Sequence, residues 1–213
     1  MGAIPCRFES DQRHKSKHLR NYTIRKSKKL AYIIGAAIGD GNLSNPNRRA
    51  VRLRITCDNK YPKIIKRILE NLQELFPENK VSLVKKQKNC TDISCYSNKL
   101  ENILEWKATN GSKFKQKISI PEWIKEKDEY IKPCIKGLIE TDGSVYYDRK
   151  YLMVNFVTII PTIANDVMEM MRKIGYKPNM QTIKESPVQE MKYTIRISKN
   201  AEEFVKDMQI NKS

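Results

Sequence analysis

The sequence predicts an α+β protein made of two similar units in one chain. Two observations predict this fold class. The order of elements, helix, two strands, helix, two strands and helix, occurs in both halves of the 213 residues. Matching landmarks recur at a nearly constant separation, since Asp40 and Asp142 are 102 positions apart and Ser97 and Ser198 are 101 apart. We therefore expect an internal duplication, with two pseudo-symmetric four-stranded sheets that carry helices on one face and leave the other face open.

The first unit is expected at residues 28–106, after a basic arm at residues 1–27. Its elements follow from apolar periodicity, which is 3.6 residues in a helix and two in a strand. In "AVRLRIT", for example, Val51, Leu53 and Ile55 alternate with polar residues, so this strand has one apolar and one basic face. The predicted elements are helix 28–40, strand 50–56, helix 61–76, strands 80–86 and 91–97, and helix 98–106 with Asn98 as its N-cap.

A linker at residues 107–120 precedes the second unit, expected at residues 121–213. This unit opens with a helical turn at Pro121 and an apolar helix that ends at Asp142. The elements predicted after it are strands near 144–149 and 151–158, helix 161–175 closed by Gly175, strands near 179–185 and 191–198, and a helix from about residue 200.

The charge of the chain predicts a polyanionic partner. The sequence has 41 Lys and Arg against 24 Asp and Glu, a net charge of +17. An isoelectric point of about 9.6 favours nucleic acid. No apolar run approaches the roughly 20 residues of a spanning helix, and no amphipathic Lys-rich helix favours membrane docking. We therefore expect a soluble, intracellular protein with no membrane partner.

The cysteines and histidines predict neither disulfides nor zinc. Five cysteines are scattered and never form a C-x-x-C pair, so reduced thiols are expected. His14 and His18 are four residues apart in the basic arm, without a Cys or carboxylate pattern beside them. A zinc site is not expected there.

Two apolar helices carry small residues at matching places. In "IIGAAIGDG" Gly35 and Gly39 lie four residues apart, and in "IKGLIETDG" Gly137 and Thr141 take the same places. Glycine inside a helix costs up to about 1 kcal/mol relative to alanine, so a packing requirement is implied. We expect the two helices to approach closely at the interface between the units.

The aspartates at the ends of these helices predict a cation site. We expect Gly41 and Gly143 to end the helices in a left-handed conformation, with Asp40 and Asp142 at the negative ends of the helix dipoles. A carboxylate is disfavoured there by roughly 0.3–1 kcal/mol, and two neighbouring carboxylates also repel each other. One Asp-Gly pair alone is most simply a turn. Two copies in the same context, in a basic protein, favour a bound divalent cation.

The two motifs resemble the paired signature of the LAGLIDADG homing endonucleases, in the two-motif, single-chain form. "LAYIIGAAIGDGNL" and "CIKGLIETDGSV" both have Asp at the eighth motif position, although Ile38 and Gly39 precede it in the first and Glu140 and Thr141 in the second. The resemblance covers nearly the whole chain from about residue 28. It implies αββαββα units with paired motif helices at the interface and antiparallel sheets that form a DNA-binding saddle.

The resemblance also implies a metal-dependent active site. Asp40 and Asp142 would be the metal-binding catalytic acids, and Gly39 and Thr141 would offer backbone carbonyls to the metal. Mg²⁺ is the expected cofactor, with Mn²⁺ as a substitute and Ca²⁺ expected to bind without supporting cleavage. Independently of the resemblance, phosphodiester hydrolysis needs a polarised phosphate, an activated water and a stabilised leaving oxygen, which Mg²⁺ provides.

Two lysines are candidates for assisting this chemistry. Motif context favours Lys115, in "KFKQKISIP", for orienting water or stabilising charge in one half, and Lys192, in "QEMKYTIRIS", for the other. A solvated lysine is the alternative interpretation of each. Cys57 falls just after "RLRIT", where several relatives carry Gln, so a water-organising residue is expected to be missing there.

Alternation along the strands predicts which residues face DNA. The residues expected to face the helices are Val51, Leu53, Ile55, Val154, Phe156, Ile195 and Ile197. The residues expected to face the duplex are Asn42, Ser44, Arg52, Arg54, Ser144, Tyr146, Asn155, Thr194 and Arg196.

The function expected from these observations is site-specific cleavage of double-stranded DNA by a monomer, at a long asymmetric target. Two alternatives stay open. One is an RNA maturase that binds its host intron RNA and assists splicing. The other is a catalytically silent DNA-binding regulator, which the loss of an acid would mark; here both acids are present.

Overall fold

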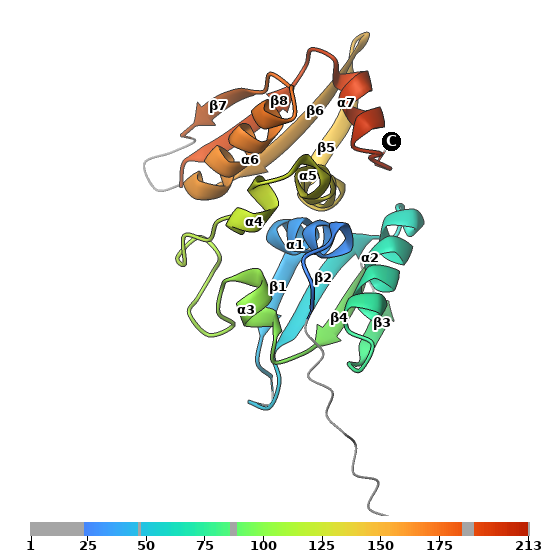
Figure 1. The fold of residues 1–213 in the computed structure, drawn as a ribbon. Helices are drawn as coiled ribbons and strands as arrows, with labels where there is room; N and C mark the ends of the chain where they lie inside the picture. Colours follow the sequence, from blue (N-terminus) through green and yellow to red (C-terminus); the bar gives the residue numbers. More distant parts are fainter. Residues whose placement is uncertain (1–23, 47, 86–88, 185–189, 213) are drawn as a thin grey trace, which may run out of the picture.

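The chain folds into two sheet-containing units on either side of a central pair of helices (Figure 1). A computed structural model describes residues 24–46, 48–85, 89–184 and 190–212. Most of the predicted basic arm, with His14 and His18, lies outside the described residues. Among the helices that are described, none combines the length and the apolar character needed to cross a bilayer.

Each unit repeats one order of elements. The first contains α1 (Lys28–Asp40), β1 (Gly41–Ser44), β2 (Arg52–Asp58), α2 (Pro62–Leu75), β3 (Val81–Lys85), β4 (Cys90–Tyr96) and α3 (Leu100–Leu104). After the short helix α4 (Glu122–Lys125), the second contains α5 (Asp128–Asp142), β5 (Gly143–Asp148), β6 (Tyr151–Thr158), α6 (Pro161–Lys173), β7 (Asn179–Ile183), β8 (Lys192–Ile197) and α7 (Ala201–Asp207). Both sheets are antiparallel, with the orders β1-β2-β4-β3 and β5-β6-β8-β7. The matching orders confirm the predicted two-unit fold.

The central helices α1 and α5 meet through their glycines. A Cβ atom at Gly35 would lie 2.1 Å from the carbonyl oxygen of Cys134, and one at Gly137 would lie 2.3 Å from that of Tyr32. A Cβ atom at Gly39 would lie 2.2 Å from Oγ1 of Thr141. Because real Cβ atoms do not approach other atoms so closely, only glycine permits this backbone contact. The predicted close helix pairing is confirmed.

The predicted conformation at the C-terminal ends of α1 and α5 and the predicted N-cap of α3 were wrong. Gly41 and Gly143 are extended rather than left-handed, with φ of −82° and −86°, because each helix passes directly into a strand. Glycine is still required, since a Cβ at Gly41 would lie 2.3 Å from the carbonyl oxygen of Ala37. Asn98 does not cap α3, whose N-cap is Lys99 without a side-chain hydrogen bond. The predicted closure of α6 at Gly175 is left-handed as expected, with φ of +91°.

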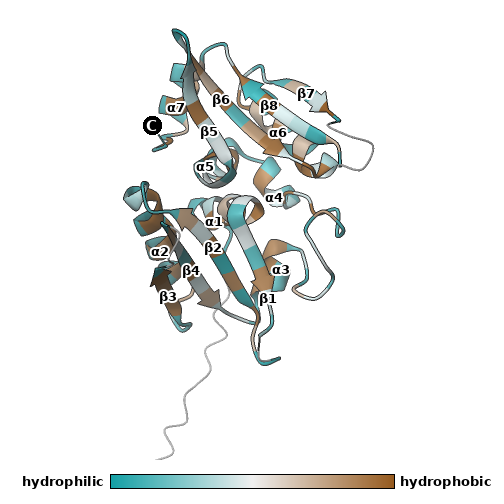
Figure 2. Ribbon diagram, turned by 180° about the vertical axis from the view of Figure 1, so that it is seen from behind, coloured by the Kyte–Doolittle hydropathy of each residue, from teal (hydrophilic) through white to brown (hydrophobic). Residues whose placement is uncertain are grey.

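The strands divide into a core face and an open face. α2 and α6 lie in front of the sheets in Figure 1 and behind them in Figure 2. The seven strand residues predicted to face the helices are all buried. The strand register places the residues predicted to face DNA on the opposite face, where Asn42 pairs with Arg54 and Asn155 pairs with both Ser144 and Arg196. The predicted division of the strand residues into a core face and an opposite face is therefore correct, and contact of the opposite face with DNA stays a prediction.

We predict that Gly137→Val destabilises the protein by at least about 2 kcal/mol, because the added side chain forces α1 and α5 apart. The measurement is the free energy of unfolding from urea titration. Gly175→Asn is the control, since its Cβ meets nothing within 4 Å and Asn tolerates a positive φ. Equal stability of Gly137→Val and wild type would contradict the described helix contact.

Candidate functional site

The aspartates at the ends of α1 and α5 come together at the open side of the helix pair. A Cβ atom at Gly39 would lie 3.1 Å from Cβ of Asp142, so the end of α1 contacts the end of α5. Asp40 and Asp142 both expose their side chains to solvent, whereas the residues before them are only partly exposed. The two carboxylates therefore face outward from a packed helix interface.

Two cavities flank the helix ends, one on each side. The Asp40 cavity combines Asp40 with Thr141 of the other helix and is completed by Cys57 and Lys212. The Asp142 cavity combines Asp142 with Gly39 of the other helix. It is completed chiefly by Lys113, Thr158 and Lys192. Each cavity thus pairs the aspartate of one helix with the residue that precedes the aspartate of the other.

A lysine binds the last carbonyl groups of each central helix. Nζ of Lys113 donates to the carbonyl oxygens of Ile38 at 2.5 Å and Gly39 at 2.6 Å. Nζ of Lys212 donates to those of Thr141 at 2.8 Å and Gly143 at 2.5 Å. The carbonyl groups of Ile38, Gly39 and Thr141 lack partners within their helices, whereas Gly143 is the first residue of β5. An ammonium group also complements the negative end of the helix dipole. The two lysines are equivalent under the pseudo-twofold relation, because Gly39 and Thr141 occupy the same motif position.

The pKa values in the site are shifted because two carboxyl groups and two ammonium groups lie close together and partly buried. Partial burial, and then the neighbouring Asp40, raise the pKa of Asp142 to about 6. Partial burial also raises the pKa of Asp40, although Lys212 and Lys113 act in the opposite direction. Burial lowers the pKa of Lys113 to about 8 and lowers that of Lys212, while the aspartates oppose both shifts. Both carboxyl groups keep an open side to solvent, so their desolvation is incomplete.

The available ligands are those of a hard cation. Carboxylate oxygens of Asp40 and Asp142 form the donor set together with the carbonyl oxygens of Gly39 and Thr141. Each of these carbonyl oxygens accepts from a lysine and keeps a second lone pair for a cation. Among the described residues, no group of three or more His, Cys, Asp and Glu could hold a metal ion. Mg²⁺ is commonly bound by one or two carboxylates together with waters and substrate phosphates. The residues present therefore fit a cation that shares its coordination with a phosphate.

The structure places the two predicted lysines differently. Lys192 lines the Asp142 cavity beside Lys113. Lys115 is exposed and lies outside the linings of both cavities, with its backbone N–H donating to Oγ of Ser112. The lysine of this loop that reaches the helix ends is Lys113.

Lys113 and Lys212 were not among the residues predicted from the sequence. Lys113 starts the same "KFKQKISIP" stretch that suggested Lys115, but a loop has no periodicity that would separate the two residues. A signal for Lys212 was present, because it follows Lys113 by 99 positions, close to the repeat interval.

Cys57 belongs to β2 rather than to the segment after it, since β2 continues to Asp58. The residue is buried, with 6 % of its surface exposed. Burial and the nearby Asp40 raise the pKa of Cys57 to about 12, so this group is protonated at neutral pH. A buried neutral thiol thus stands at the position where a polar water-organising residue was expected to be missing.

Polar side chains on the open faces are held by one another. Nδ2 of Asn155 donates to Oη of Tyr146 at 2.9 Å, and Nε of Arg196 donates to Oδ1 of Asn155 at 3.2 Å. On the first sheet, Nε of Arg52 donates to Oγ of Ser44 at 3.1 Å. Such contacts fix the guanidinium groups before any ligand arrives.

Comparisons with known proteins agree with this geometry. Residues 129–209 match the family model of the LAGLIDADG-like domain. This stretch of the chain is a LAGLIDADG-like domain. No curated protein sequence matches the chain. Among solved structures, it is similar to I-DmoI in complex with DNA and Mn, with a TM-score of 0.62 and 20% identity over 85% of this chain and 96% of that one.

Two further solved structures resemble this chain. One is I-DmoI in complex with DNA and Ca, with a TM-score of 0.63 and 19% identity over 85% of this chain and 88% of that one. The other is the N-terminal LAGLIDADG domain of DUF199/WhiA, with a TM-score of 0.58 and 12% identity over 90% of this chain and 88% of that one. At these identities the likeness establishes the fold.

We predict that N-ethylmaleimide at pH 7.5 modifies Cys90 at least about ten times faster than Cys57, Cys95 and Cys134, because these three are buried whereas Cys90 is partly exposed. Mass spectrometry of peptides from timed samples measures each rate separately. Rapid modification of Cys57 in the folded protein would show that its side chain does not face the core.

Proposed function

We propose that this protein is a metal-dependent endonuclease of the LAGLIDADG type, which cuts both strands of a specific DNA site as a monomer. The observation that carries the proposal is the pair of cavities, each with one aspartate, one carbonyl group from the opposite helix and a lysine that donates to that carbonyl group. Two such constellations on one chain suit two phosphodiester bonds, one in each strand. Fold likeness to I-DmoI, described as a homing endonuclease, is consistent with this proposal.

The residues of each cavity have distinct roles in the proposed reaction. Asp40 and the Thr141 carbonyl group would hold a divalent cation in one cavity, and Asp142 and the Gly39 carbonyl group in the other. When bound, Mg²⁺ supplies a polarised phosphate and a more acidic water. The ammonium groups of Lys212 and Lys113 place positive charge beside the negative charge that develops on the phosphate and leaving oxygen.

The open faces of the sheets would bind the duplex. Arg52, Arg54 and Arg196 lie there among polar side chains, and the chain as a whole carries a charge of +17. Guanidinium groups recognise guanine edges in the major groove, and basic residues generally neutralise phosphates. The two sheets bear different residues at matching places, which favours an asymmetric target.

The alternatives differ in what they require of the acids. A silent DNA-binding regulator has no need for two carboxylates gathered at the negative ends of two helix dipoles. No feature of the described residues favours intron RNA over duplex DNA as a ligand. We therefore propose the nuclease, with Mg²⁺ as its cofactor.

The decisive test concerns the aspartates. We predict that Asp40→Asn and Asp142→Asn each reduce double-strand cleavage by about 100-fold or more, because loss of a metal ligand removes several kcal/mol of charge stabilisation. Fold and DNA affinity should be preserved, since Asn is nearly isosteric and removes a negative charge close to the phosphates. The measurement is linearisation of a supercoiled plasmid with Mg²⁺, with Ca²⁺ in parallel.

The plasmid carries a target selected by the wild-type protein from a randomised duplex library. Asp128→Asn is the matched control, because Asp128 lies at the opposite end of α5 and is exposed. If an Asn variant at position 40 or 142 linearises the plasmid at the wild-type rate, or if wild type never cuts with Mg²⁺, the nuclease assignment fails.

A second test concerns the open face. Arg54→Ala should weaken target binding by about 1–3 kcal/mol if its guanidinium group contacts a guanine, and should lower the salt slope by about one unit if it meets a phosphate. Fluorescence anisotropy at several salt concentrations separates these effects. Lys66→Ala removes an exposed charge from α2, on the other side of the first sheet, and should change neither quantity. Unchanged binding by Arg54→Ala would place the duplex elsewhere.

A further inference from the structure

Glu140 is a buried carboxylate in the wall of the Asp40 cavity, and the proposed reaction does not use it. It lies on α5 two residues before Asp142, and its side chain is 0% exposed. In the sequence it stands out only as a departure from the usual motif. Burying an ionised carboxylate is costly unless charged and hydrogen-bonding partners compensate, so the partners of Glu140 indicate its purpose.

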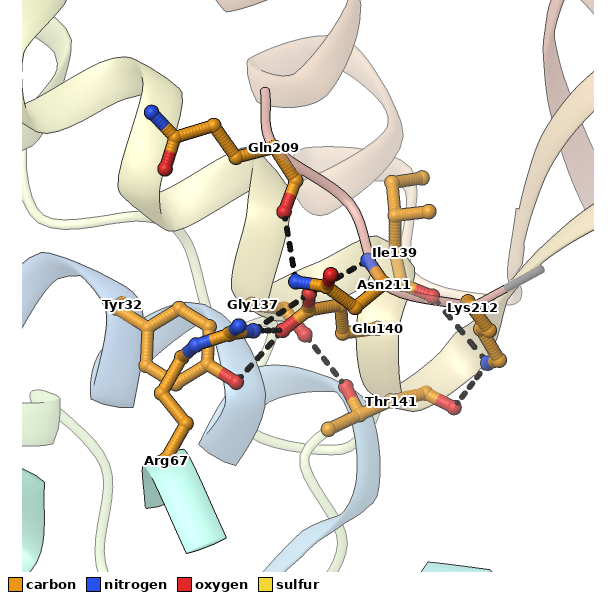
Figure 3. A network of polar contacts seen from close by, with 9 residues as sticks. All are labelled: Tyr32, Arg67, Gly137, Ile139, Glu140, Thr141, Gln209, Asn211 and Lys212. Atoms are coloured by element: carbon orange, nitrogen blue, oxygen red, sulfur yellow. Dashed lines mark hydrogen bonds and ion pairs between the residues drawn. The ribbon is translucent and has the colours of Figure 1, made fainter. Parts of the chain in front are cut away.

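The partners of Glu140 come from three separate parts of the chain (Figure 3). Nη1 of Arg67, from α2, donates to both carboxylate oxygens at 2.7 Å. Oη of Tyr32, from α1, donates to Oε2 at 2.8 Å. The backbone N–H of Asn211, from the segment after α7, donates to Oε1 at 3.0 Å. Glu140 thus connects both units with residues 208–212, which we call the tail segment.

The contact with Asn211 bears directly on the Asp40 cavity, because the next residue is Lys212. Nζ of Lys212 reaches the carbonyl oxygens of Thr141 and Gly143 at 2.8 and 2.5 Å. The side chain of Asn211 also donates to the carbonyl oxygen of Gln209 at 3.1 Å, which shapes the backbone just before the lysine (Figure 3). Glu140 therefore fixes the tail segment at the residue adjacent to the ammonium group of this cavity.

The Asp142 cavity receives its lysine by a different route. Lys113 lies in the loop between α3 and α4, where Gln116 joins the backbone groups of Lys107 and Gly111. None of these contacts involves Glu140 or Arg67. In the first motif the place of Glu140 is taken by Ile38, which offers no carboxylate. The two cavities therefore obtain equivalent ammonium groups from differently anchored segments.

We propose that Glu140 is a positioning residue that, with Arg67, docks the tail segment and so completes the Asp40 cavity with Lys212. The inference rests on the proposed function. It adds that only one of the two DNA strands depends on Glu140 for its cleavage. Cleavage of the strand that enters the Asp40 cavity requires the Glu140 network, and cleavage of the other strand does not.

The test measures the two strands separately. A duplex with the selected target carries a different fluorophore on each strand, and single-turnover rates are determined with Mg²⁺. Glu140→Met removes every acceptor oxygen at similar volume, and Lys212→Met removes only the ammonium group. Both variants should slow cleavage of the same strand, at least ten-fold more than cleavage of the other strand. Nicked duplex should therefore accumulate. Lys113→Met should slow cleavage of the opposite strand.

Conservative and structural variants complete the design. Glu140→Gln keeps an acceptor oxygen, and Lys212→Arg keeps the charge, so both should restore much of the lost rate. Asp166→Asn is the matched control, because Asp166 is another buried carboxylate that accepts from the Ile120 backbone and from Lys125, away from both cavities. Asp166→Asn should slow cleavage of the two strands equally or not at all. Equal slowing of both strands by Lys212→Met would overturn the proposal, even if Glu140→Met failed to fold.

A second readout needs no cleavage. Hydrogen exchange of the Asn211 amide, followed by NMR in the metal-free protein, reports docking of the tail segment directly. Exchange should be at least ten-fold faster in Glu140→Met than in wild type and unchanged in Asp166→Asn. Equal exchange in wild type and Glu140→Met would refute docking by Glu140. If wild type cuts neither strand, the proposed function and the strand dependence fail together, whereas the amide exchange still decides the docking.

Discussion

The contact between the backbones of α1 and α5 is the constraint on which the rest of the structure depends. Gly35 and Gly137 allow carbonyl groups of one helix to approach the other at distances that no Cβ atom would permit. This contact fixes the relative position of the two units and brings the helix ends, with Asp40 and Asp142, to one place. It also makes each cavity a joint product of both helices, because the aspartate of one lies beside a carbonyl group of the other. A single unit would offer half of each ligand set.

Gathering two carboxylates at the negative ends of two helix dipoles has an electrostatic cost, and the chain offsets it with lysines. Lys113 and Lys212 each bind terminal carbonyl groups and also oppose the rise in pKa that burial causes in Asp40 and Asp142. The ammonium groups themselves are partly desolvated, which lowers their own pKa values. The site is thus built from opposed charges that stabilise one another without full pairing. Such an arrangement leaves room for a cation and a phosphate to join.

The duplicated units are equivalent in backbone but not in chemistry. The second motif carries Glu140 and Thr141 where the first carries Ile38 and Gly39. Glu140 introduces a buried charge, which Arg67, Tyr32 and the tail segment compensate (Figure 3). A substitution inside the interface is therefore linked to the anchoring of a segment far along the chain. Because the proposed DNA target is asymmetric, the two units would contact different sequences and need not carry the same side chains.

The sequence by itself determined the order of elements and the duplication. It also determined which strand residues face the core and that Asp40 and Asp142 end the two central helices. These features depend on short-range periodicity or on a repeated interval, which the chain records directly. It did not determine that Gly41 is extended, because that follows from the direct passage of α1 into β1. Nor did it separate Lys113 from Lys115, since a loop has no period. Lys212 and the role of Glu140 were decided only by tertiary structure, because their contacts join residues about 70 to 110 positions apart, and long-range contacts form only when both units are in place.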